Sequence, residues 1–86
     1  MSDGAGISQL ADRGQGRCEL SGALTLESVP WLWKELENTG LLAQAREADL
    51  SAVNAADSAG LALLVAWRAH CRRQGGELAF HGLPRR

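Results

Sequence analysis

Residues 49–64 constrain the fold of this 86-residue chain more than any other segment. They read as the end of a strand, a short loop containing two residues typical of helix caps, Asp57 and Ser58, and an apolar run of helix formers after Gly60. The backbone N–H groups at such a helix start point outward, so the Ser58 hydroxyl is placed to be held by a partner or to carry a phosphate. This pattern predicts a binding or switch surface rather than a catalytic site.

Length and charge exclude several classes of protein. A chain of this size forms one small domain, which buries only roughly 60–65% of the surface that its unfolded state exposes. Nine Lys and Arg against ten Asp and Glu predict no general attraction to nucleic acid or to an anionic membrane. After residue 57, five bases stand against Glu77 alone, so one end of the molecule is expected to be electropositive. The longest apolar run, residues 61–67, is too short for direct membrane insertion.

The two cysteines, Cys18 and Cys71, lie far apart in the sequence and form no CxxC motif. No export signal is recognisable either. Two buried structural thiols in a reducing cytosol are therefore expected, rather than a disulfide framework.

Hydrophobic periodicity and turn residues predict the element order β-β-α-β-α-β within a single domain over residues 7–86, preceded by a flexible leader at 1–6. The predicted elements are strands at 7–11 and 17–21 around a hairpin turn at 12–16, a helix from 26 or 28 to 38, a connector at 41–46, a strand at 47–51, a helix at 58–73 and a strand at 77–81. Two strand–helix–strand units favour a partly parallel sheet with right-handed crossovers, and the hairpin adds an antiparallel edge. We expect an α/β domain with a small mixed four-stranded sheet and helices mainly on one face.

The helix expected at 58–73 has two different faces at about 100° per residue. The face assigned to the core holds Gly60, Leu63, Leu64, Trp67 and Cys71, and Gly60 lets the helix start lie close to the sheet. The opposite face holds Ser58, Leu61, Ala62, Val65, Ala69 and Arg72. Its apolar strip, bounded by Ser58 at one end and by Arg68, Arg72 and Arg73 at the other, is typical of a partner-binding surface.

Simpler explanations stand beside this one. Burial of both helix faces within the domain, or ordinary exposed Leu and Ala, explains the strip equally well. A plain helix cap accounts for Ser58 without further assumptions. The arginines are commonly complements of the helix dipole and solvated charges.

The sequence contains no motif for catalysis or for a cofactor. The only lysine, Lys34, is not in a glycine-rich phosphate loop, and Ser58 is not in a Gly-x-Ser-x-Gly motif. Neither His70 nor His81 has the spacing of a catalytic base or of a zinc ligand, so a small enzyme with a Ser58 nucleophile is a remote alternative. The three tryptophans lack interleaved basic residues and are expected to be core or interface anchors, not base-stacking platforms.

Three segments resemble the successive signature segments of a STAS domain: Leu20-Ser21-Gly22-Ala23-Leu24, Asp49-Leu50-Ser51-x-Val53 and Asp57-Ser58-Ala59-Gly60-Leu61. The resemblance spans about residues 7–83 and implies the STAS fold, in agreement with the element order above. STAS domains work by binding. They include anti-sigma factor antagonists, whose phosphorylatable serine matches Ser58, and cytoplasmic subunits attached to membrane transporters.

Within this family, residues 31–33, residues 60–64 and the turn at 74–76 resemble the STAS subunits of bacterial phospholipid ABC transporters. The resemblance implies a non-catalytic cytoplasmic protein without a cofactor. It would bind the ATPase subunit and, through it, an inner-membrane permease complex that maintains outer-membrane lipid asymmetry. The expected partner-binding residues are Asp57, Ser58, Ala59, Leu61, Ala62, Val65 and Arg68. An anti-sigma factor antagonist that a kinase regulates at Ser58 stays open as the alternative.

The chain stops at Arg86, whereas STAS chains usually continue past the last predicted strand into another helix. Without that helix, part of the sheet is expected to be uncovered and to depend on a partner for burial. The isolated domain should therefore melt no higher than the usual mesophile range of about 45–65 °C, as measured by circular dichroism. A cooperative melt well above this range would contradict the prediction.

Overall fold

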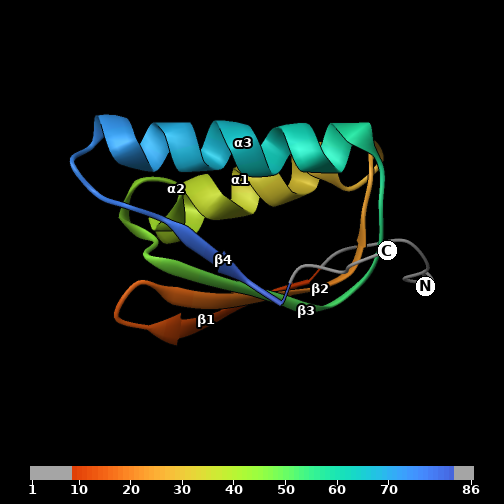
Figure 1. The fold of residues 1–86 in the computed structure, drawn as a ribbon, viewed down its shortest axis with the longest axis horizontal. Coiled ribbons are helices and arrows are strands. Elements are labelled where there is room, and N and C mark those ends of the chain that lie inside the picture. Colours follow the sequence, from red (N-terminus) through yellow and green to blue (C-terminus); the bar gives the residue numbers. More distant parts are fainter. Residues whose placement is uncertain (1–8, 83–86) are drawn as a thin grey trace.

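Four strands form one mixed sheet, and the helices lie together on one of its faces (Figure 1). The computed structural model describes residues 9–82, so the predicted leader lies outside the described residues. The elements are β1 (Gln9–Gly14), β2 (Arg17–Leu24), α1 (Val29–Thr39), α2 (Leu41–Gln44), β3 (Glu47–Ala56), α3 (Ser58–Arg73) and β4 (Ala79–His81). The predicted α/β class, four-stranded sheet and one-sided helix layer are confirmed.

The strands lie in the order β1-β2-β3-β4. The β1–β2 hairpin is antiparallel, whereas β2 with β3 and β3 with β4 are parallel. Each parallel pair is connected through helices, α1 and α2 in the first case and α3 in the second. The predicted arrangement of a parallel sheet with an antiparallel edge is therefore confirmed.

The hairpin turn is shorter than predicted. Only Gln15 and Gly16 separate the two strands, and both have positive φ angles, 57° and 79°. Two successive residues with positive φ are typical of the type I′ turn, whose twist matches that of a hairpin. A bulge between Asp12 and Gly14 bends β1 just before this turn. The two residues at the start of the first predicted strand lie outside the described residues.

A short helix, α2, occupies part of the segment that we predicted to be a connector. Its backbone is held from α3: the Trp67 indole Nε1 donates to the Leu41 carbonyl oxygen at 3.0 Å, and the Cys71 thiol donates to that of Leu42 at 3.2 Å. Four residues are too few for a helical period to show in a sequence. The tertiary contacts with α3 explain this helix.

Strand β3 is twice as long as predicted, because it continues past residue 51 to Ala56. Its second half pairs in parallel with the end of β2, where Ser21 lies opposite Ala52 and Leu24 opposite Ala56. Three alanines and an asparagine give this half little strand propensity of its own. Conversely, β4 is shorter than predicted and begins at Ala79 rather than 77.

The core lies between the helices and the sheet. Its fully buried members include Leu20, Leu24, Leu32, Leu36, Leu50, Trp67 and Cys71. Val29, Trp33 and Phe80 are partly buried against this cluster, so α1 faces the core with Val29, Leu32, Trp33 and Leu36. The ring centroids of Trp67 and Phe80 lie 5.9 Å apart, and this aromatic contact links α3 to β4. Cys18 and Cys71 are free and buried, as expected.

Gly60 brings the first turn of α3 into contact with the end of β2. A Cβ atom at this position would overlap with the carbonyl oxygen of Leu24 and lie 2.9 Å from its Cγ. Backbone atoms cannot give way as a flexible side chain can. The close approach predicted from the sequence is therefore a steric requirement.

Gly60→Ala is expected to lower the free energy of unfolding by about 3 kcal/mol, because α3 must move away from β2 to accommodate the methyl group. Urea unfolding measures the loss. Gly76→Ala is the matched control, since its Cβ would lie 3.6 Å from the nearest atom outside its neighbours, an ordinary contact, and should change stability by less than about 1 kcal/mol. Equal stability of the two variants would contradict the steric explanation.

Candidate functional site

A single residue, Asp57, connects β3 to α3 and caps the helix. Its Oδ1 accepts a hydrogen bond from Gly60 N at 2.9 Å, and its Oδ2 accepts one from Leu26 N at 3.0 Å. Its own N–H donates to the Leu24 carbonyl oxygen at 3.2 Å. The loop that we predicted before the helix is thus reduced to one residue. Asp57 joins the ends of β2 and β3 to the start of α3, which lie at the same end of the domain (Figure 1).

Ser58 is the first residue of α3 and is exposed. The simpler explanation that Ser58 caps the helix is wrong, because the carboxylate of Asp57 makes the cap. A cap needs a residue with extended backbone, and Asp57 has φ −119° and ψ −175°. The side chain of Ser58 is therefore not committed to capping.

The Asp57 carboxylate is held in its charged form. The hydrogen bond from Gly60 N, and then that from Leu26 N, hold the pKa of Asp57 below its usual range. A negative charge at this end also interacts favourably with the helix dipole. The hydroxyl of Ser58 accordingly lies beside a permanent negative charge at neutral pH.

The two faces of α3 divide as the sequence predicted. All five residues assigned to the core are buried: Gly60, Leu63, Leu64, Trp67 and Cys71. On the opposite face, Leu61 is 50% and Val65 69% exposed. Ser58, Ala62, Arg68 and Arg72 are exposed as well, whereas Ala59 and Ala69 are half-buried. The explanation that both faces are buried within the domain is therefore excluded for the described residues.

We call this exposed face, made of Ser58, Leu61, Ala62, Val65, Arg68, Ala69 and Arg72, the outer face of α3. It carries no acidic residue, because the helix itself has none. Its basic residues stand in the second half of the helix, and the last turn contains His70, Arg72 and Arg73. The outer face thus runs from a hydroxyl through an apolar centre to a positive end.

A groove of about 440 Å³ lies between the outer face of α3 and β4. It is lined by Leu61, Leu64, Val65, Arg68, Ala69, Arg72 and Phe80. Phe80 is not among the predicted site residues, because no pattern along one helix shows which strand lies beside it. The apolar part of the surface is therefore wider than the predicted strip.

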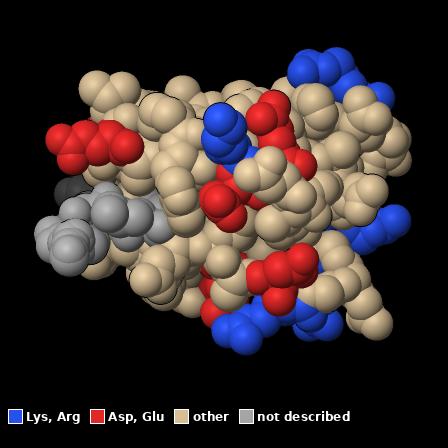
Figure 2. All heavy atoms as spheres, turned by 180° about the vertical axis from the view of Figure 1, so that it is seen from behind, with Lys and Arg blue, Asp and Glu red and all other residues tan. Residues whose placement is uncertain are grey.

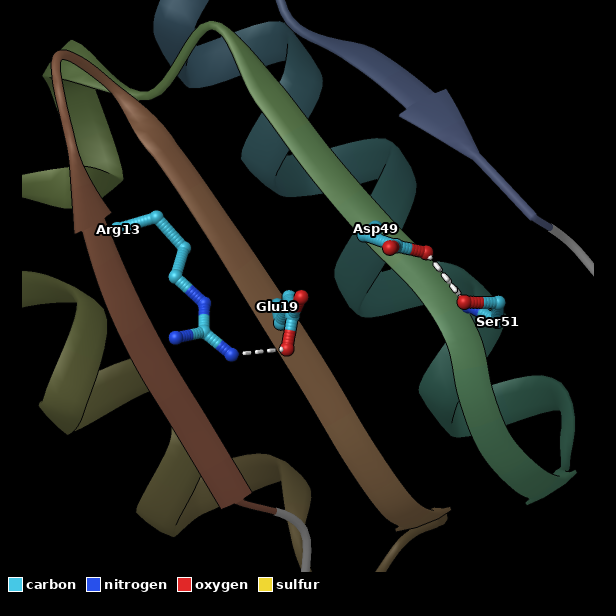
Figure 3. A network of polar contacts seen from close by, with 4 residues as sticks. All are labelled: Arg13, Glu19, Asp49 and Ser51. Carbon is cyan, nitrogen blue, oxygen red and sulfur yellow. Dashed lines mark hydrogen bonds and ion pairs between the residues drawn. The ribbon is translucent and has the colours of Figure 1, made fainter.

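The opposite face of the sheet is open and polar (Figure 3). Arg13 Nη2 lies 2.7 Å from Glu19 Oε1, and Ser51 Oγ donates to Asp49 Oδ1 at 2.6 Å. A shallow cavity of about 290 Å³ on this face is lined by Arg13, Arg17, Cys18, Glu19, Glu47, Asp49 and His81. This cluster was not predicted from the sequence, although polar residues at every second position in the first halves of β2 and β3 signal a solvated face.

The charged side chains of Arg13, Arg17 and Asp49 on the open face all have polar partners. Arg13 pairs with Glu19, Arg17 lies 3.6 Å from Glu47, and the hydrogen bonds from Ser51 hold the pKa of Asp49 below its usual range. Seen from behind, the molecule also shows acidic and basic side chains interspersed (Figure 2). The uncovered side of the sheet is therefore hydrophilic and does not itself require burial.

The described part of the chain shows no metal-binding group of three or more His, Cys, Asp or Glu residues. Both thiols are protonated at neutral pH, because burial raises the pKa of Cys71 and raises that of Cys18 to about 12. Within residues 9–82, no helix is long and apolar enough to cross a membrane.

Asp57→Ala is expected to lower the melting temperature by roughly 4–8 °C at pH 7, the usual effect of losing a helix cap in a domain of this size. The folded-state pKa of Asp57 is depressed, so its contribution is present above the unfolded pKa of about 3.9 and is lost as the pH falls through the folded pKa. The difference in melting temperature between wild type and variant should therefore shrink below about pH 4. A difference that is constant from pH 7 to pH 3 would contradict this role.

Comparisons with known proteins agree with this architecture. Residues 7–86 match the family model described as "Mlab, STAS domain". No curated protein matches the chain. The match covers almost the whole chain, and the mixed four-stranded sheet with its helices on one face is consistent with a STAS fold. The chain therefore belongs to the STAS domain family.

Proposed function

We propose that this chain is a non-catalytic accessory subunit of an Mla-type ABC transporter, which moves phospholipids and maintains the lipid asymmetry of the outer membrane. It binds the ATPase subunit in the cytoplasm and is held at the inner membrane through the permease complex. The description of the matching family model, which names Mlab, supports this choice among STAS proteins.

The strongest support for this proposal is the exposed apolar centre of the outer face of α3. The helix already fills the core with its inner face, yet two large apolar side chains, Leu61 and Val65, stand at least half exposed on the other side. Apolar side chains grouped on one face and bordered by polar residues mark protein interaction sites. Because the face has no acid and ends in arginines, it fits a partner surface with an apolar centre and acidic residues beside Arg68 and Arg72.

A binding role also accounts for Ser58. Neither His70 nor His81 has the sequence spacing of a catalytic base for Ser58, which favours binding over nucleophilic attack. Its exposed hydroxyl at the start of the outer face instead lies where a docked partner would cover it. We therefore place Ser58 within the contact.

Ser58→Asp and Leu61→Arg are each expected to reduce recovery of the ABC ATPase roughly tenfold or more, because each places a charge in a surface that loses water on binding. The tagged chain is purified from its own cells, from cytosol and solubilised membranes, and bound proteins are quantified by mass spectrometry. Asn38→Arg, at an exposed position of α1, adds the same charge as Leu61→Arg away from α3 and should leave recovery unchanged. Unchanged recovery with Ser58→Asp and Leu61→Arg would remove the outer face of α3 as the interface.

A phosphorylation switch of the anti-sigma factor antagonist type is the second candidate. It is favoured by the exposure of Ser58 in the first turn of a helix, where the N–H groups stabilise a phosphate. The same purification tests it through the mass of the Ser58 peptide. An ABC ATPase with unmodified Ser58 supports the transporter subunit, whereas a histidine-kinase-like anti-sigma factor with phosphorylated Ser58 supports the switch.

A further inference from the structure

The connection between β2 and α1, residues 25–28, is rigidly held beside the start of α3. Within it, Ser28 Oγ accepts a hydrogen bond from Thr25 N at 3.0 Å and donates to the Ala23 carbonyl oxygen at 2.9 Å. The Ser28 hydroxyl is buried, and Ser28 N donates to the Thr25 carbonyl oxygen at 3.0 Å. The side chain of Ser28 thus fixes the shape of this connection from inside the domain.

Leu26 is the exposed point of this connection. Its side chain is 69% exposed, as much as that of Val65 on the outer face of α3, whereas its backbone N–H is bound to Asp57 Oδ2 at 3.0 Å. Asp57 directly precedes Ser58, and Leu61 follows one helical turn later on the same side of the helix. Leu26 therefore adds an apolar side chain next to the hydroxyl end of the outer face.

We infer that Leu26 is a further partner-contact residue and that Asp57 positions it. This inference rests on the proposed function, with the ATPase subunit as the occupant. The binding surface then extends from Leu26, across Ser58 and Leu61, to Arg68 and Arg72. Its two ends differ, since one carries Leu26 beside the Asp57 carboxylate and the other carries Arg68 and Arg72, and this difference fixes the direction in which an acidic and apolar partner surface lies along α3.

The rigidity of the connection supports this role. Binding costs free energy when a flexible loop must be ordered, and a leucine on a preformed connection avoids most of that cost. Asp57 contributes by accepting two hydrogen bonds at once, one from the helix and one from Leu26. An asparagine at position 57 has one side-chain oxygen, so it can accept strongly only one of the two hydrogen bonds, that from Gly60 N or that from Leu26 N. The Asp57→Asn variant therefore separates the helix cap from the positioning of Leu26.

The test is quantitative recovery of the ABC ATPase with variants at Leu26 and Asp57. Leu26→Arg should reduce recovery roughly tenfold and Leu26→Ala a few-fold, both with unchanged melting temperature because the side chain is exposed. Glu27→Ala, the exposed neighbour in the same connection, is the matched control and should leave recovery unchanged. Asp57→Asn should reduce recovery by about the same factor as Leu26→Ala, and the double variant should lose no more than either single variant.

The outcomes separate this inference from the proposed function. If Leu61→Arg loses the ATPase while both Leu26 variants retain it, Leu26 is not a contact and the proposed function stands. If the fold-losses in ATPase recovery caused by Asp57→Asn and Leu26→Ala multiply in the double variant, Asp57 contacts the partner by itself. Its positioning role is then overturned. If Leu61→Arg also retains the ATPase, the proposed function falls and this inference falls with it.

Discussion

The first turn of α3 can lie against the end of β2 only because residue 60 has no side chain. This approach places Asp57 where its backbone N–H reaches the Leu24 carbonyl oxygen and its carboxylate reaches Leu26 N. The ends of two neighbouring strands and the start of the longest helix are thereby fixed in one small unit. The position of the whole outer face of α3 relative to the sheet follows from that contact.

The sequence predicted α3 well and its surroundings less well, for physical reasons. Alternation between large apolar and small or charged residues, read at the helical period, placed every buried residue of α3 correctly. The helical state of residues 41–44 depends on hydrogen bonds from Trp67 and Cys71, which lie more than 25 positions away, and no local pattern contains them. The second half of β3 similarly exists because β2 pairs with it, not because alanines favour strands.

For the candidate site, most residues could be predicted from the sequence, but the separate roles of Asp57 and Ser58 could not. Asp57 and Ser58 are both good caps by type, and only the backbone geometry shows that Asp57 holds the helix and leaves Ser58 exposed. Leu26 escaped notice because its place beside Asp57 results from a contact between residues 31 positions apart. The open face of the sheet, in contrast, could have been predicted from the local sequence, because polar residues alternate along the first halves of β2 and β3.

Both edges of the sheet are poor templates for another strand. On β1, the bulge after Asp12 and the Arg13–Glu19 pair interrupt a flat edge, and on β4 only three of the residues that the structure describes take part in pairing. Long, regular and uncharged edges invite strand addition between molecules, whereas bulges, charges and short strands oppose it. Self-assembly into extended sheets is therefore disfavoured at either edge, even though apolar side chains remain exposed on α3.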